Sequence, residues 1–392
     1  MKIVMTGGGS GGHITPLMAV AKEIKQQVAD AECIYIGQRG DVFGEVVAEN
    51  AIIDQTFTVQ AGKFRRYHGK GWKQFVHPET LWLNVRDGFK VIAGIFQAIA
   101  LIWRIKPDVL FCKGGFVGVP IGLAAAILRV PYVTHDSDAI PGLANRLIAR
   151  WATCHAVALD IKSYPYPAEK SVSVGVPINN NYHSIDTQEK RAERVRLGLD
   201  HYRNIVLVTG GGLGAQRLNE AVIAYAKDIL EALPETCIIH ATGQLHEAEC
   251  SALYTKLLTK SQRSQVIVRG FVNNLHEYSA AADIVVARGG ATSFAELALQ
   301  AKPCIIVPNP YLTSGHQIKN AVAYERKHAI VCVQEADLDA EPKLLAKKII
   351  ALLSDTKKQA SLSHAIASFA RPDSTNKLAS LLIDVASKKG RA

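Results

Sequence analysis

Residues 7–16 read GGGSGGHITP and stand between a short apolar run, Lys2 to Thr6, and a helix-like run, Pro16 to Val28. The first run is rich in β-forming residues, and Pro16 suits the first turn of a helix. The stretch is therefore a turn from a strand to a helix. Such a glycine-rich turn exposes backbone N–H groups at the positive end of a helix dipole, where α/β proteins hold phosphate. His13 adds an imidazole, which has a chemical use in a group-transfer enzyme.

The turn does not match the dinucleotide-binding fingerprint well. No acidic residue stands at the end of the second apolar run, Cys33 to Gly37, where a ribose-binding acid would be needed. A nicotinamide-dependent dehydrogenase is therefore disfavoured, and we expect no cofactor.

Length and composition indicate a globular protein with two cores. The chain has 392 residues, too many for one ordinary domain, and 48% of them are hydrophobic. Its 7 cysteines are scattered without a C-x-x-C pair, which indicates reduced, buried thiols and no zinc site or disulfide framework. The N-terminus opens into the first strand, so no signal peptide is expected. The net charge of +10 predicts an anionic partner: nucleic acid, an anionic membrane or a phosphorylated substrate.

Strand-like and helix-like segments alternate along the chain, the pattern of parallel sheets covered by helices on both faces. In the first series we expect strands at 33–36, 108–112, 131–135 and 154–158 and helices at 16–28, 89–105, 118–129 and 141–151. In the second series we expect strands at 205–209, 236–241, 265–268, 283–287, 303–307 and 329–333 and helices near 215–232, 290–300 and 315–327. The expected fold class is α/β, with two Rossmann-like parallel-sheet domains facing across a cleft.

A segment rich in Pro, Asn, Ser and charged residues, Ile161 to Gly198, separates the two series and is typical of a linker or hinge. We expect a first domain over residues 1–178 and a second domain over residues 179–371. The final helical stretch, within residues 372–392, is expected to return to the first domain.

Two further glycine-rich turns repeat the arrangement of the first one. TGGGLGA, residues 209–215, follows the first strand of the second series, as TGGGSG, residues 6–11, follows the first strand of the chain. CKGGFVGVP, residues 112–120, also joins a strand to a helix and contains Gly114 and Gly115. Glycine also lets a helix pack closely on a sheet, but three such turns favour contact with phosphate.

The second series contains two polar segments that suit a nucleotide sugar. In ARGGATSFAE, residues 287–296, a strand runs into small residues and a helix, so the amides near Gly290 and Ala291 can face a diphosphate. Glu296 can accept hydrogen bonds from a ribose diol, although the helix dipole alone also favours a carboxylate there. A later segment carries neutral side chains suited to sugar hydroxyls: His316, Gln317 and Asn320.

A basic and aromatic stretch falls within residues 62–87. No acidic residue occurs between Asp54 and Glu79, and the side chains there include Lys63, Phe64, Arg65, Arg66, Tyr67, Lys70, Trp72, Lys73 and Phe75. Such a stretch can bind an anionic lipid interface or stack on single-stranded nucleic acid. A solvated loop is the plainer alternative.

The chain resembles the MurG family in the order of six segments. They are GGGSGGHITP, GGFVGVP, HDSDAIPGLANR (135–146), TGGGLGAQRLN, RGGATSFAE and HQIKN, and the resemblance runs from residue 3 to residue 375. Members of that family transfer GlcNAc from UDP-GlcNAc to the undecaprenyl-diphosphate-linked MurNAc-pentapeptide in bacterial wall synthesis. The resemblance implies a GT-B fold, inverting transfer and peripheral association with the cytoplasmic face of the cell membrane.

The resemblance also implies a division of the site. The donor UDP-GlcNAc would bind the second domain through Gly212, Val272, Arg288, Gly290, Ala291, Thr292, Glu296, His316, Gln317 and Asn320. Among these, the Val272 backbone would face uracil and Glu296 the ribose. The lipid-linked acceptor would bind the first domain through Gly11, Gly12, His13, Gly114, Gly115 and Asn145.

Three segments depart from the family's pattern. His135-Asp136-Ser137-Asp138 stands where the family has H-E-Q-N, and Asn179 stands where the hinge has an arginine that could reach phosphate. Gly212 stands where the second glycine loop has a serine. The first departure concerns the side of the site expected to contact the acceptor.

Inverting transfer needs a general base on the acceptor hydroxyl and stabilisation of the departing UDP. We expect His13 to be that base or to orient it, because the helix dipole disfavours imidazolium and keeps the ring neutral near pH 7. A histidine that only braces the loop is the alternative. No D-x-D motif is evident. We therefore expect no essential metal, with the diphosphate held by Arg288 and the helix start near Gly290.

Other functions remain as alternatives. The nearest are other GT-B enzymes, such as a diacylglycerol glycosyltransferase or a UDP-GlcNAc 2-epimerase. A nucleic-acid-binding protein that uses residues 63–75 is more distant, because nothing else in the chain resembles a nucleic-acid module. The expected partners are therefore UDP-GlcNAc, the lipid-linked MurNAc-peptide and an anionic membrane surface, with no nucleic acid.

Overall fold

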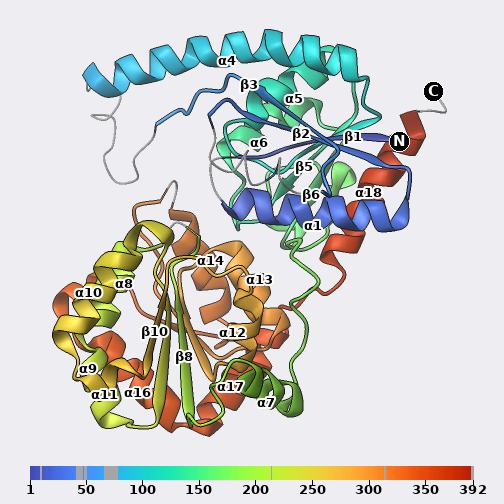
Figure 1. Ribbon diagram of the computed structural model, residues 1–392. Helices are drawn as coiled ribbons and strands as arrows, with labels where there is room; N and C mark the ends of the chain where they lie inside the picture. Colours follow the sequence, from blue (N-terminus) through green and yellow to red (C-terminus); the bar gives the residue numbers. More distant parts are fainter. Residues whose placement is uncertain are drawn as a thin grey trace. The chain divides into compact units, whose positions relative to one another are not determined.

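The computed structural model describes residues 1–8, 11–40, 47, 51–65, 78–212, 214–312 and 315–389. The chain forms two compact units (Figure 1). Unit 1 comprises Met1–Asn180, Tyr311–His316 and Arg371–Ala392, and unit 2 comprises Asn181–Pro310 and Gln317–Ala370. The cleft expected between two such domains stays a prediction.

Unit 1 is built on a parallel sheet with the strand order β3-β2-β1-β4-β5-β6-β7. Within the described residues its strands are β1 (Lys2–Thr6), β2 (Glu32–Gln38), β3 (Gln55–Val59), β4 (Val109–Cys112), β5 (Tyr132–Asp136), β6 (Cys154–Val157) and β7 (Ser171–Ser173). The central strands are continuous buried runs, as in β4, where all residues are buried. Such runs form when helices cover both faces of a parallel sheet.

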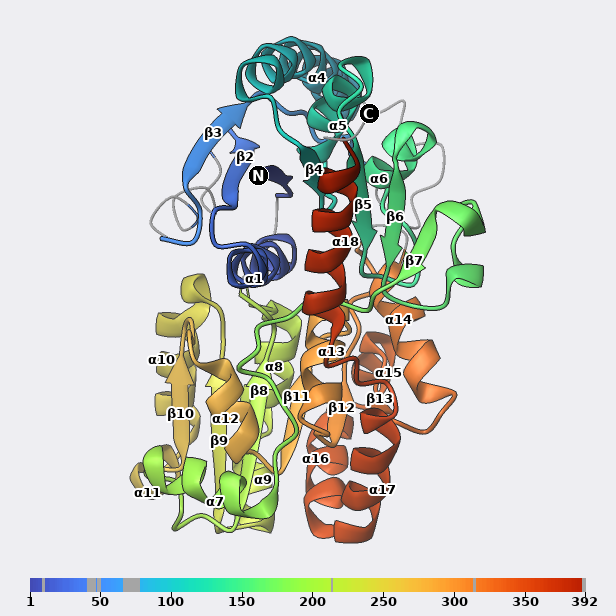
Figure 2. The same cartoon turned by 90° about the vertical axis from the view of Figure 1, so that its right-hand side faces the viewer.

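Helices cover the unit 1 sheet on both faces. One core contains side chains of α1 (Gly11–Gln27) and α18 (Ser374–Lys389), which pack on each other (Figure 2). The other core contains side chains of α4 (Pro78–Ile105), α5 (Gly118–Ile127) and α6 (Leu143–Ile148). Short 3₁₀ turns span Ala149–Trp151, Ile161–Ser163 and Ala168–Lys170.

The first turn of α18 also holds the segment that leaves β7. Ser374 Oγ donates to the Val176 carbonyl at 2.8 Å, and Thr375 Oγ1 donates to the Ile178 carbonyl at 2.8 Å. The last helix of the chain is therefore tied to unit 1 through backbone groups as well as through its apolar face.

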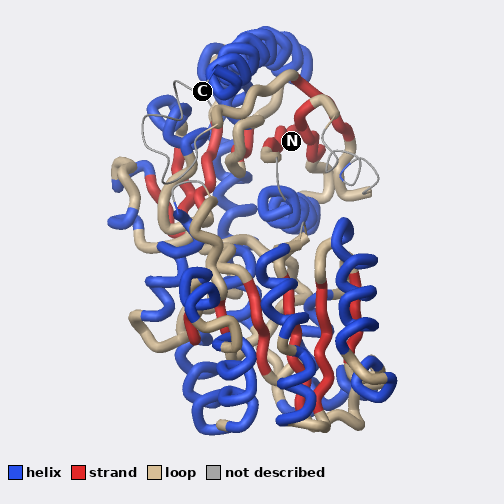
Figure 3. Tube along the Cα trace, turned by 90° about the vertical axis from the view of Figure 1, so that its left-hand side faces the viewer, coloured by secondary structure: helices blue, strands red, loops and turns tan. Residues whose placement is uncertain are grey.

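Unit 2 repeats the design with the strand order β10-β9-β8-β11-β12-β13. Its described strands are β8 (Asn204–Thr209), β9 (Thr236–Ala241), β10 (Val266–Arg269), β11 (Ile284–Ala287), β12 (Cys304–Ile306) and β13 (Val331–Cys332). Its helices are α7 (Thr187–Arg196), α8 (Gln216–Ala224), α9 (Ala226–Ala232), α10 (Glu247–Leu257), α11 (Lys260–Arg263), α12 (Leu275–Ala281), α13 (Ala291–Leu299), α14 (His316–Glu325), α15 (Glu335–Ala340), α16 (Leu344–Ser354) and α17 (Thr356–Ala367), with a 3₁₀ turn at Gln244–His246. Figure 3 shows helices on both sides of the strands.

Both sheets share one arrangement at their centre. β1 pairs with β2 on one side and β4 on the other, and β8 pairs with β9 and β11 in the same way. Because all these strands are parallel, the turns after β1 and β4 meet at one edge, and the turns after β8 and β11 meet at the corresponding edge of unit 2. The α/β class with two Rossmann-like sheets is confirmed.

The structure corrects several expected boundaries. α1 begins at Gly11, so Pro16 lies inside the helix and His13 lies in its first turn. α4 begins at Pro78 and not near residue 89, because polar residues interrupt its apolar pattern at the start. The expected helix over 215–232 is broken at Tyr225 into α8 and α9.

Several described elements have no counterpart in the prediction: β3, β7, α7, α10, α11, α12, α15, α16 and α17. β3 is a half-exposed edge strand, and β7 is a short edge strand, so neither shows a continuous apolar run. α7 has no buried residue and was interpreted as linker, but Asp186 caps its start by accepting from the Glu189 amide at 2.8 Å. Polar helices and edge strands lack the periodic burial on which such predictions depend.

Candidate active site

The turn after β1 is held by hydrogen bonds from β2. Tyr35 donates its hydroxyl to the Gly7 carbonyl at 2.6 Å, and Thr6 Oγ1 donates to the Ile36 carbonyl at 2.9 Å. A Cβ atom on Gly7 would lie 3.1 Å from Lys113 Cβ and 3.6 Å from His13 Cβ. The turn therefore packs tightly against both residues. Gly11 and Gly12 stand in the first turn of α1, where helix amides lack intrahelical acceptors.

The turn after β4 meets the turn after β1. Gly114 and Gly115 have φ angles of +111° and +80°, which favour glycine. A Cβ on Gly115 would lie 2.4 Å from the Gly8 carbonyl oxygen, so a side chain there would separate the two turns. A Cβ on Gly114 would lie 3.6 Å from His13 Nε2 and 3.6 Å from Asn145 Nδ2. His13, Gly114, Gly115 and Asn145, predicted as acceptor-side residues, thus converge.

Asn145, in α6, is buried, and only part of the hydrogen-bonding capacity of its side-chain amide is used. Its Nδ2 donates to the His135 carbonyl at 2.9 Å and to Asp136 Oδ1 at 3.0 Å. Its Oδ1 has no hydrogen-bond partner among the described residues. A buried amide oxygen of this kind can accept from a substrate hydroxyl.

Asp136 is the acid that departs from the family pattern, and the protein itself uses its carboxylate. Besides Asn145, it accepts from the Gly142 amide at 3.0 Å and from the Tyr166 hydroxyl at 2.7 Å. Burial raises the pKa of Asp136 above its ordinary value, and these donors oppose the rise. The carboxylate thus fixes the loop between β5 and α6, and with it the position of Asn145.

Lys113, Ser137 and His135 form a hydrogen-bonded chain that the sequence interpretation missed. Lys113 is 3% exposed, and its Nζ donates to Ser137 Oγ at 2.7 Å. Ser137 Oγ lies 3.5 Å from His135 Nδ1, and His135 Nε2 lies 2.9 Å from the Gly175 carbonyl oxygen. Because a carbonyl only accepts, Nε2 carries the proton and Nδ1 accepts from the hydroxyl. Burial and the Lys113 ammonium hold the pKa of His135 well below its ordinary value.

His13 is neutral near pH 7. The ring is half-buried, and burial together with the Lys113 ammonium lowers the pKa of His13 to about 4. The amino-terminal end of α1 acts in the same direction, because its dipole disfavours a cation. An imidazole in this state can accept a proton.

In unit 2 the turn after β8 carries Gly211 and Gly214 with φ angles of +84° and +76°. A Cβ on Gly212 would lie 3.6 Å from the Phe271 ring, which is 59% exposed. Val272 follows Phe271 in the loop between β10 and α12. The structure thus brings Gly212 close to the residue before Val272.

The turn after β11 presents an uncapped helix start. Gly290 is the N-cap of α13 in extended backbone, and it makes no side-chain capping bond. The first amides of α13, at Ala291 and Thr292, are therefore available to an anion. Glu296 lies in the second turn of α13, where burial raises its pKa; burial, together with Glu296, also raises the pKa of Tyr182.

Arg288 is a buried brace of this turn. Its Nη1 donates to Glu335 Oε1 at 2.6 Å and to the Val307 carbonyl at 3.0 Å. Both members of the ion pair are nearly inaccessible to solvent. Glu335, the first residue of α15, was not predicted to be part of the site. Its carboxylate pairs with the Arg288 guanidinium, which was expected to bind the donor diphosphate.

The polar residues of α14 support the same turn. Asn320 Nδ2 donates to the Gly289 carbonyl at 3.2 Å, and Gln317 Oε1 accepts from the Asn309 amide at 2.9 Å. His316 is the first residue of α14 and the last residue of the unit 1 segment Tyr311–His316, whereas the rest of α14 belongs to unit 2. The structure therefore connects Gln317 and Asn320 with the loops after β11 and β12.

Across residues 1–8, 11–40, 47, 51–65, 78–212, 214–312 and 315–389, no group of three or more His, Cys, Asp or Glu side chains is arranged to hold a metal ion. That metal is not essential stays a prediction.

Two Rossmann-like α/β units, each with glycine-rich turns at the carboxyl ends of its central strands, define a protein of the GT-B fold class. The family model described as "Glycosyltransferase family 28 N-terminal domain" matches residues 3–157, and the one described as "Glycosyltransferase family 28 C-terminal domain" matches residues 205–378. The chain belongs to glycosyltransferase family 28.

Curated relatives match nearly the full length of the chain. A protein of Bacillus licheniformis is 30% identical over 382 residues, which cover 97% of this chain and 98% of the relative. A protein of Halalkalibacterium halodurans is 32% identical over 341 residues, which cover 87% of this chain and 88% of the relative. Both are named UDP-N-acetylglucosamine--N-acetylmuramyl-(pentapeptide) pyrophosphoryl-undecaprenol N-acetylglucosamine transferase.

Solved structures share the fold. The crystal structure of Acinetobacter baumannii MurG superposes with a TM-score of 0.69 at 21% identity, covering 98% of this chain and 99% of that chain. A UDP-GlcNAc 2-epimerase from Neisseria meningitidis superposes with a TM-score of 0.66 at 12% identity, covering 98% and 100%. At these identities the likeness establishes the fold and not the reaction.

Proposed function

We propose that the chain transfers GlcNAc from UDP-GlcNAc to an undecaprenyl-diphosphate-linked MurNAc-pentapeptide, with inversion at the anomeric carbon. The names of relatives that are about 30% identical over nearly the whole chain support this reaction. So does the site in unit 1, where His13 Nε2 faces Gly114 beside the buried Asn145 amide. That convergence is the observation that carries the proposal, because it offers a neutral base and an anion-binding helix start together.

The acceptor is assigned to unit 1. Its diphosphate would meet the amides of the first turn of α1, at Gly11 and Gly12, and the backbone of Gly114 and Gly115. His13 Nε2 would take the proton of the acceptor hydroxyl as the hydroxyl oxygen forms its bond to the anomeric carbon. The bond from that carbon to the diphosphate oxygen breaks, and its electron pair leaves with UDP.

The donor is assigned to unit 2. The amides of Gly290, Ala291 and Thr292 at the start of α13 would hold the diphosphate and stabilise the charge that develops on UDP. The remaining donor residues are proposed to contact the nucleotide and sugar: Gly212, Val272, Glu296, His316, Gln317 and Asn320. Arg288 would act mainly by holding the turn, since its guanidinium is paired with Glu335.

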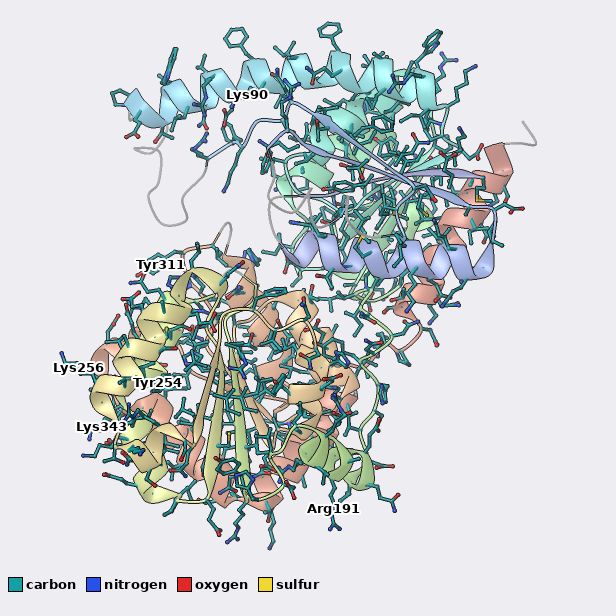
Figure 4. All side chains as sticks on the ribbon, in the orientation of Figure 1. Lys90, Arg191, Tyr254, Lys256, Tyr311 and Lys343 are labelled. Atoms are coloured by element: carbon teal, nitrogen blue, oxygen red, sulfur yellow. The ribbon has the colours of Figure 1, made fainter. Side chains whose placement is uncertain are left out.

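We propose that the outer face of α4 binds the surface of an anionic membrane. Trp82, Phe89, Phe96 and Trp103 recur every seven residues and are 66% to 70% exposed. Seven residues are about two helical turns, so the four rings lie along one side of the helix. In Figure 4 a row of α4 side chains projects from the helix away from the sheet of unit 1, and others point toward it.

The opposite face of α4 is packed on unit 1. Ala98 and Ile102 are buried in the core, and a Cβ on Gly94 would lie 1.9 Å from the Gln60 carbonyl oxygen. Among the described residues, α4 is long and apolar enough to cross a bilayer by length and composition alone. Its packed inner face instead supports a helix that lies in the interface, as the peripheral location proposed from the sequence requires.

Basic side chains flank the aromatic row. Arg65, Arg86 and Lys90 all form ion pairs with Asp87, so three cations share one carboxylate. The excess charge suits an anionic lipid surface. The predicted basic and aromatic stretch is described only in part, because residues 66–77 lie outside the described residues.

A transfer assay tests the reaction. Purified protein receives radiolabelled UDP-GlcNAc and lipid-linked MurNAc-pentapeptide, with UDP-glucose and UDP-galactose as alternative donors. We expect label in the lipid product from UDP-GlcNAc only. Conversion of the donor without acceptor would indicate an epimerase, and transfer to diacylglycerol alone would indicate a lipid glycosyltransferase. Either outcome, or no labelled lipid, contradicts the proposal.

A vesicle sedimentation assay tests the membrane surface. We expect the Phe89→Ser/Phe96→Ser variant to lose at least about tenfold in partitioning to anionic vesicles. Two phenyl rings that move from water into the lipid contribute several kcal/mol of transfer free energy, and the variant lacks both. Leu245→Ser is the matched control, since Leu245 is 87% exposed in unit 2. Equal partitioning of wild type and the double variant would exclude this face of α4 as the contact.

A further inference from the structure

A cation followed by two glycines occurs at the same place in both units. Lys113-Gly114-Gly115 follows β4, the strand beside β1, and Arg288-Gly289-Gly290 follows β11, the strand beside β8. Both side chains are buried, at 3% and 7% exposure. The two turns are therefore comparable, and each buried charge needs a partner.

Arg288 has an ion-pair partner inside the protein, whereas Lys113 has none among the described residues. Arg288 forms its ion pair with Glu335, whereas Lys113 makes one hydrogen bond, to the uncharged Ser137 hydroxyl, and no ion pair with a carboxylate in the described part of the chain. An ammonium group can donate three hydrogen bonds. Two donors of Lys113 therefore have no hydrogen-bond partner among the described residues.

Asp136, one of two acids that act on Lys113, cannot contact it without losing other bonds. Both oxygens of Asp136 already accept, Oδ1 from Gly142 and Asn145 and Oδ2 from Tyr166. Asp138 and Asp136 act on Lys113 electrostatically but form no ion pair with it, and a buried ammonium that no carboxylate contacts costs several kcal/mol in the ligand-free protein. An anionic ligand would offset that cost when it binds.

Lys113 lies beside the glycine turns, where the acceptor diphosphate is proposed to bind. Its backbone amide donates to the Thr6 carbonyl at 2.9 Å, which places it beside the residue that starts the first turn. Gly115, which is half-exposed, follows two residues later and carries no side chain that would cover its backbone. The Asn145 oxygen that has no partner among the described residues lies in the same cluster.

We propose that Lys113 is an anion-binding residue of the acceptor site, whose ammonium group pairs with a phosphate oxygen of the acceptor diphosphate. The assignment rests on the proposed function, because it takes the diphosphate from the proposed acceptor. Ser137 holds the ammonium in place by accepting one of its hydrogen bonds, since the Ser137 hydroxyl proton is directed to His135 Nδ1. Burial lowers the pKa of Lys113 to about 8, with Asp138 and Asp136 opposing, so the group is still mostly charged near pH 7.

Steady-state kinetics of Lys113→Met test the residue in transfer. We expect the acceptor KM to rise by about tenfold or more, as for loss of a charged hydrogen bond, with the KM for UDP-GlcNAc unchanged within twofold. Lys113→Arg, which keeps the charge, should recover part of the affinity. An acceptor KM within twofold of wild type in Lys113→Met would overturn the proposal.

Lys302→Met is the matched control. Lys302 is also buried, at 4% exposure, but its ammonium donates to the Ala280 and Ala282 carbonyls at the end of α12, at 2.7 and 3.1 Å. Its loss should lower stability without changing the acceptor KM. An equal rise of the acceptor KM in both variants would show a general effect of removing a buried lysine and would overturn the proposal.

Binding of inorganic pyrophosphate separates this proposal from the transfer reaction. Calorimetry is done on UDP-saturated protein, so that the donor site is occupied. We expect wild type and Lys302→Met to bind pyrophosphate and Lys113→Met to bind at least about tenfold more weakly. Equal affinity in all three, or no saturable binding by wild type, would refute an anion site at Lys113 whether or not the chain transfers GlcNAc.

Discussion

The buried cations of the two units differ in what satisfies their charge. In unit 2 the guanidinium of Arg288 meets Glu335 at 2.6 Å, so the turn after β11 is complete without a ligand. In unit 1 the ammonium of Lys113 donates to the Ser137 hydroxyl at 2.7 Å and forms no ion pair within the part of the chain that the structure describes. An internal ion pair makes a rigid support, whereas a buried charge without a counter-ion provides binding energy for an anion. The same position in two similar sheets thus has two roles.

The difference changes the expected part of Arg288 in donor binding. A guanidinium held by Glu335 and by the Val307 carbonyl supports the backbone of the turn more than it adds free charge. The uncapped amides at the start of α13 are then the main donors for a nucleotide diphosphate. Unit 1 combines a similar helix start, at α1, with a separate cation.

The largest expected effect concerns the base, which only the unit 1 turn provides in our account. His13→Ala should lower kcat by about a hundredfold to ten thousandfold with both substrates saturating, as for loss of a general base. His201→Ala, an exposed histidine of unit 2, is the control and should match wild type. Near-native turnover by His13→Ala would leave His13 as a loop-bracing residue.

The next effect concerns the ion pair of unit 2. Glu335→Gln should cost about 3 kcal/mol of unit 2 stability, because it leaves the buried Arg288 charge unpaired. All 4 tryptophans, at positions 72, 82, 103 and 151, belong to unit 1, so tryptophan emission does not report the unfolding of unit 2. Amide hydrogen exchange of β11 and β12 measures the stability of unit 2 instead.

Glu341→Gln serves as the control for that variant. Glu341 forms a half-exposed pair with Lys347, and such pairs contribute at most about 1 kcal/mol. Similar destabilisation by Glu335→Gln and Glu341→Gln would mean that the buried pair is not the support we describe.

A smaller effect separates the glycines of the two turns. Gly115→Ala should cost about 2 kcal/mol or more, because its φ is +80° and its Cβ would meet the Gly8 carbonyl oxygen at 2.4 Å. Gly290→Ala should cost less than about 1 kcal/mol, because its φ is −74° and its Cβ would have no neighbour closer than 3.8 Å. Urea unfolding followed by tryptophan emission measures the first variant, and amide exchange measures the second. Equal costs would show that the close approach of the two unit 1 turns is not required.

A further effect, which appears only above neutral pH, is a pH dependence of the stability of unit 1. The pKa of Lys113, about 8, lies below the value near 10.4 of an unfolded lysine, so between these pH values the unfolded chain binds more protons. The stability of wild type relative to Lys113→Met should therefore rise with pH, by at most about 1.4 kcal/mol per unit from pH 8 to 10. Urea unfolding of both proteins without ligand, monitored by tryptophan emission, measures the difference. A difference that does not change with pH would mean that Lys113 is not buried as a charged group.

The sequence predicted the central strands and the glycine turns well, because continuous apolar runs and runs of glycine are local signals. β3 was missed because its residues are half-exposed, and α7 because a polar helix has no apolar face. For the same reason α4 was predicted to begin near residue 89, since polar residues obscure the pattern in its first turns.

Within the site, His13 and Gly114 stand in motifs that can be recognised from the sequence. Lys113 was visible in the same motif, but its burial depends on the packing of two turns and on Ser137, 24 residues away. The partner of Arg288 is 47 residues away in another helix, and no local pattern indicates which carboxylate a buried arginine will meet. Contacts of this kind require the fold.

Amide hydrogen exchange with each substrate alone tests the central claim, that the arginine turn serves the nucleotide and the lysine turn serves the acceptor. We expect UDP to slow exchange in the first turn of α13, around Ala291 and Thr292, without slowing it at Gly114 to Val117. The lipid-linked acceptor should slow exchange at Gly114 to Val117 and in the first turn of α1. Protection of the unit 1 turns by UDP, with none at the start of α13, would contradict the account.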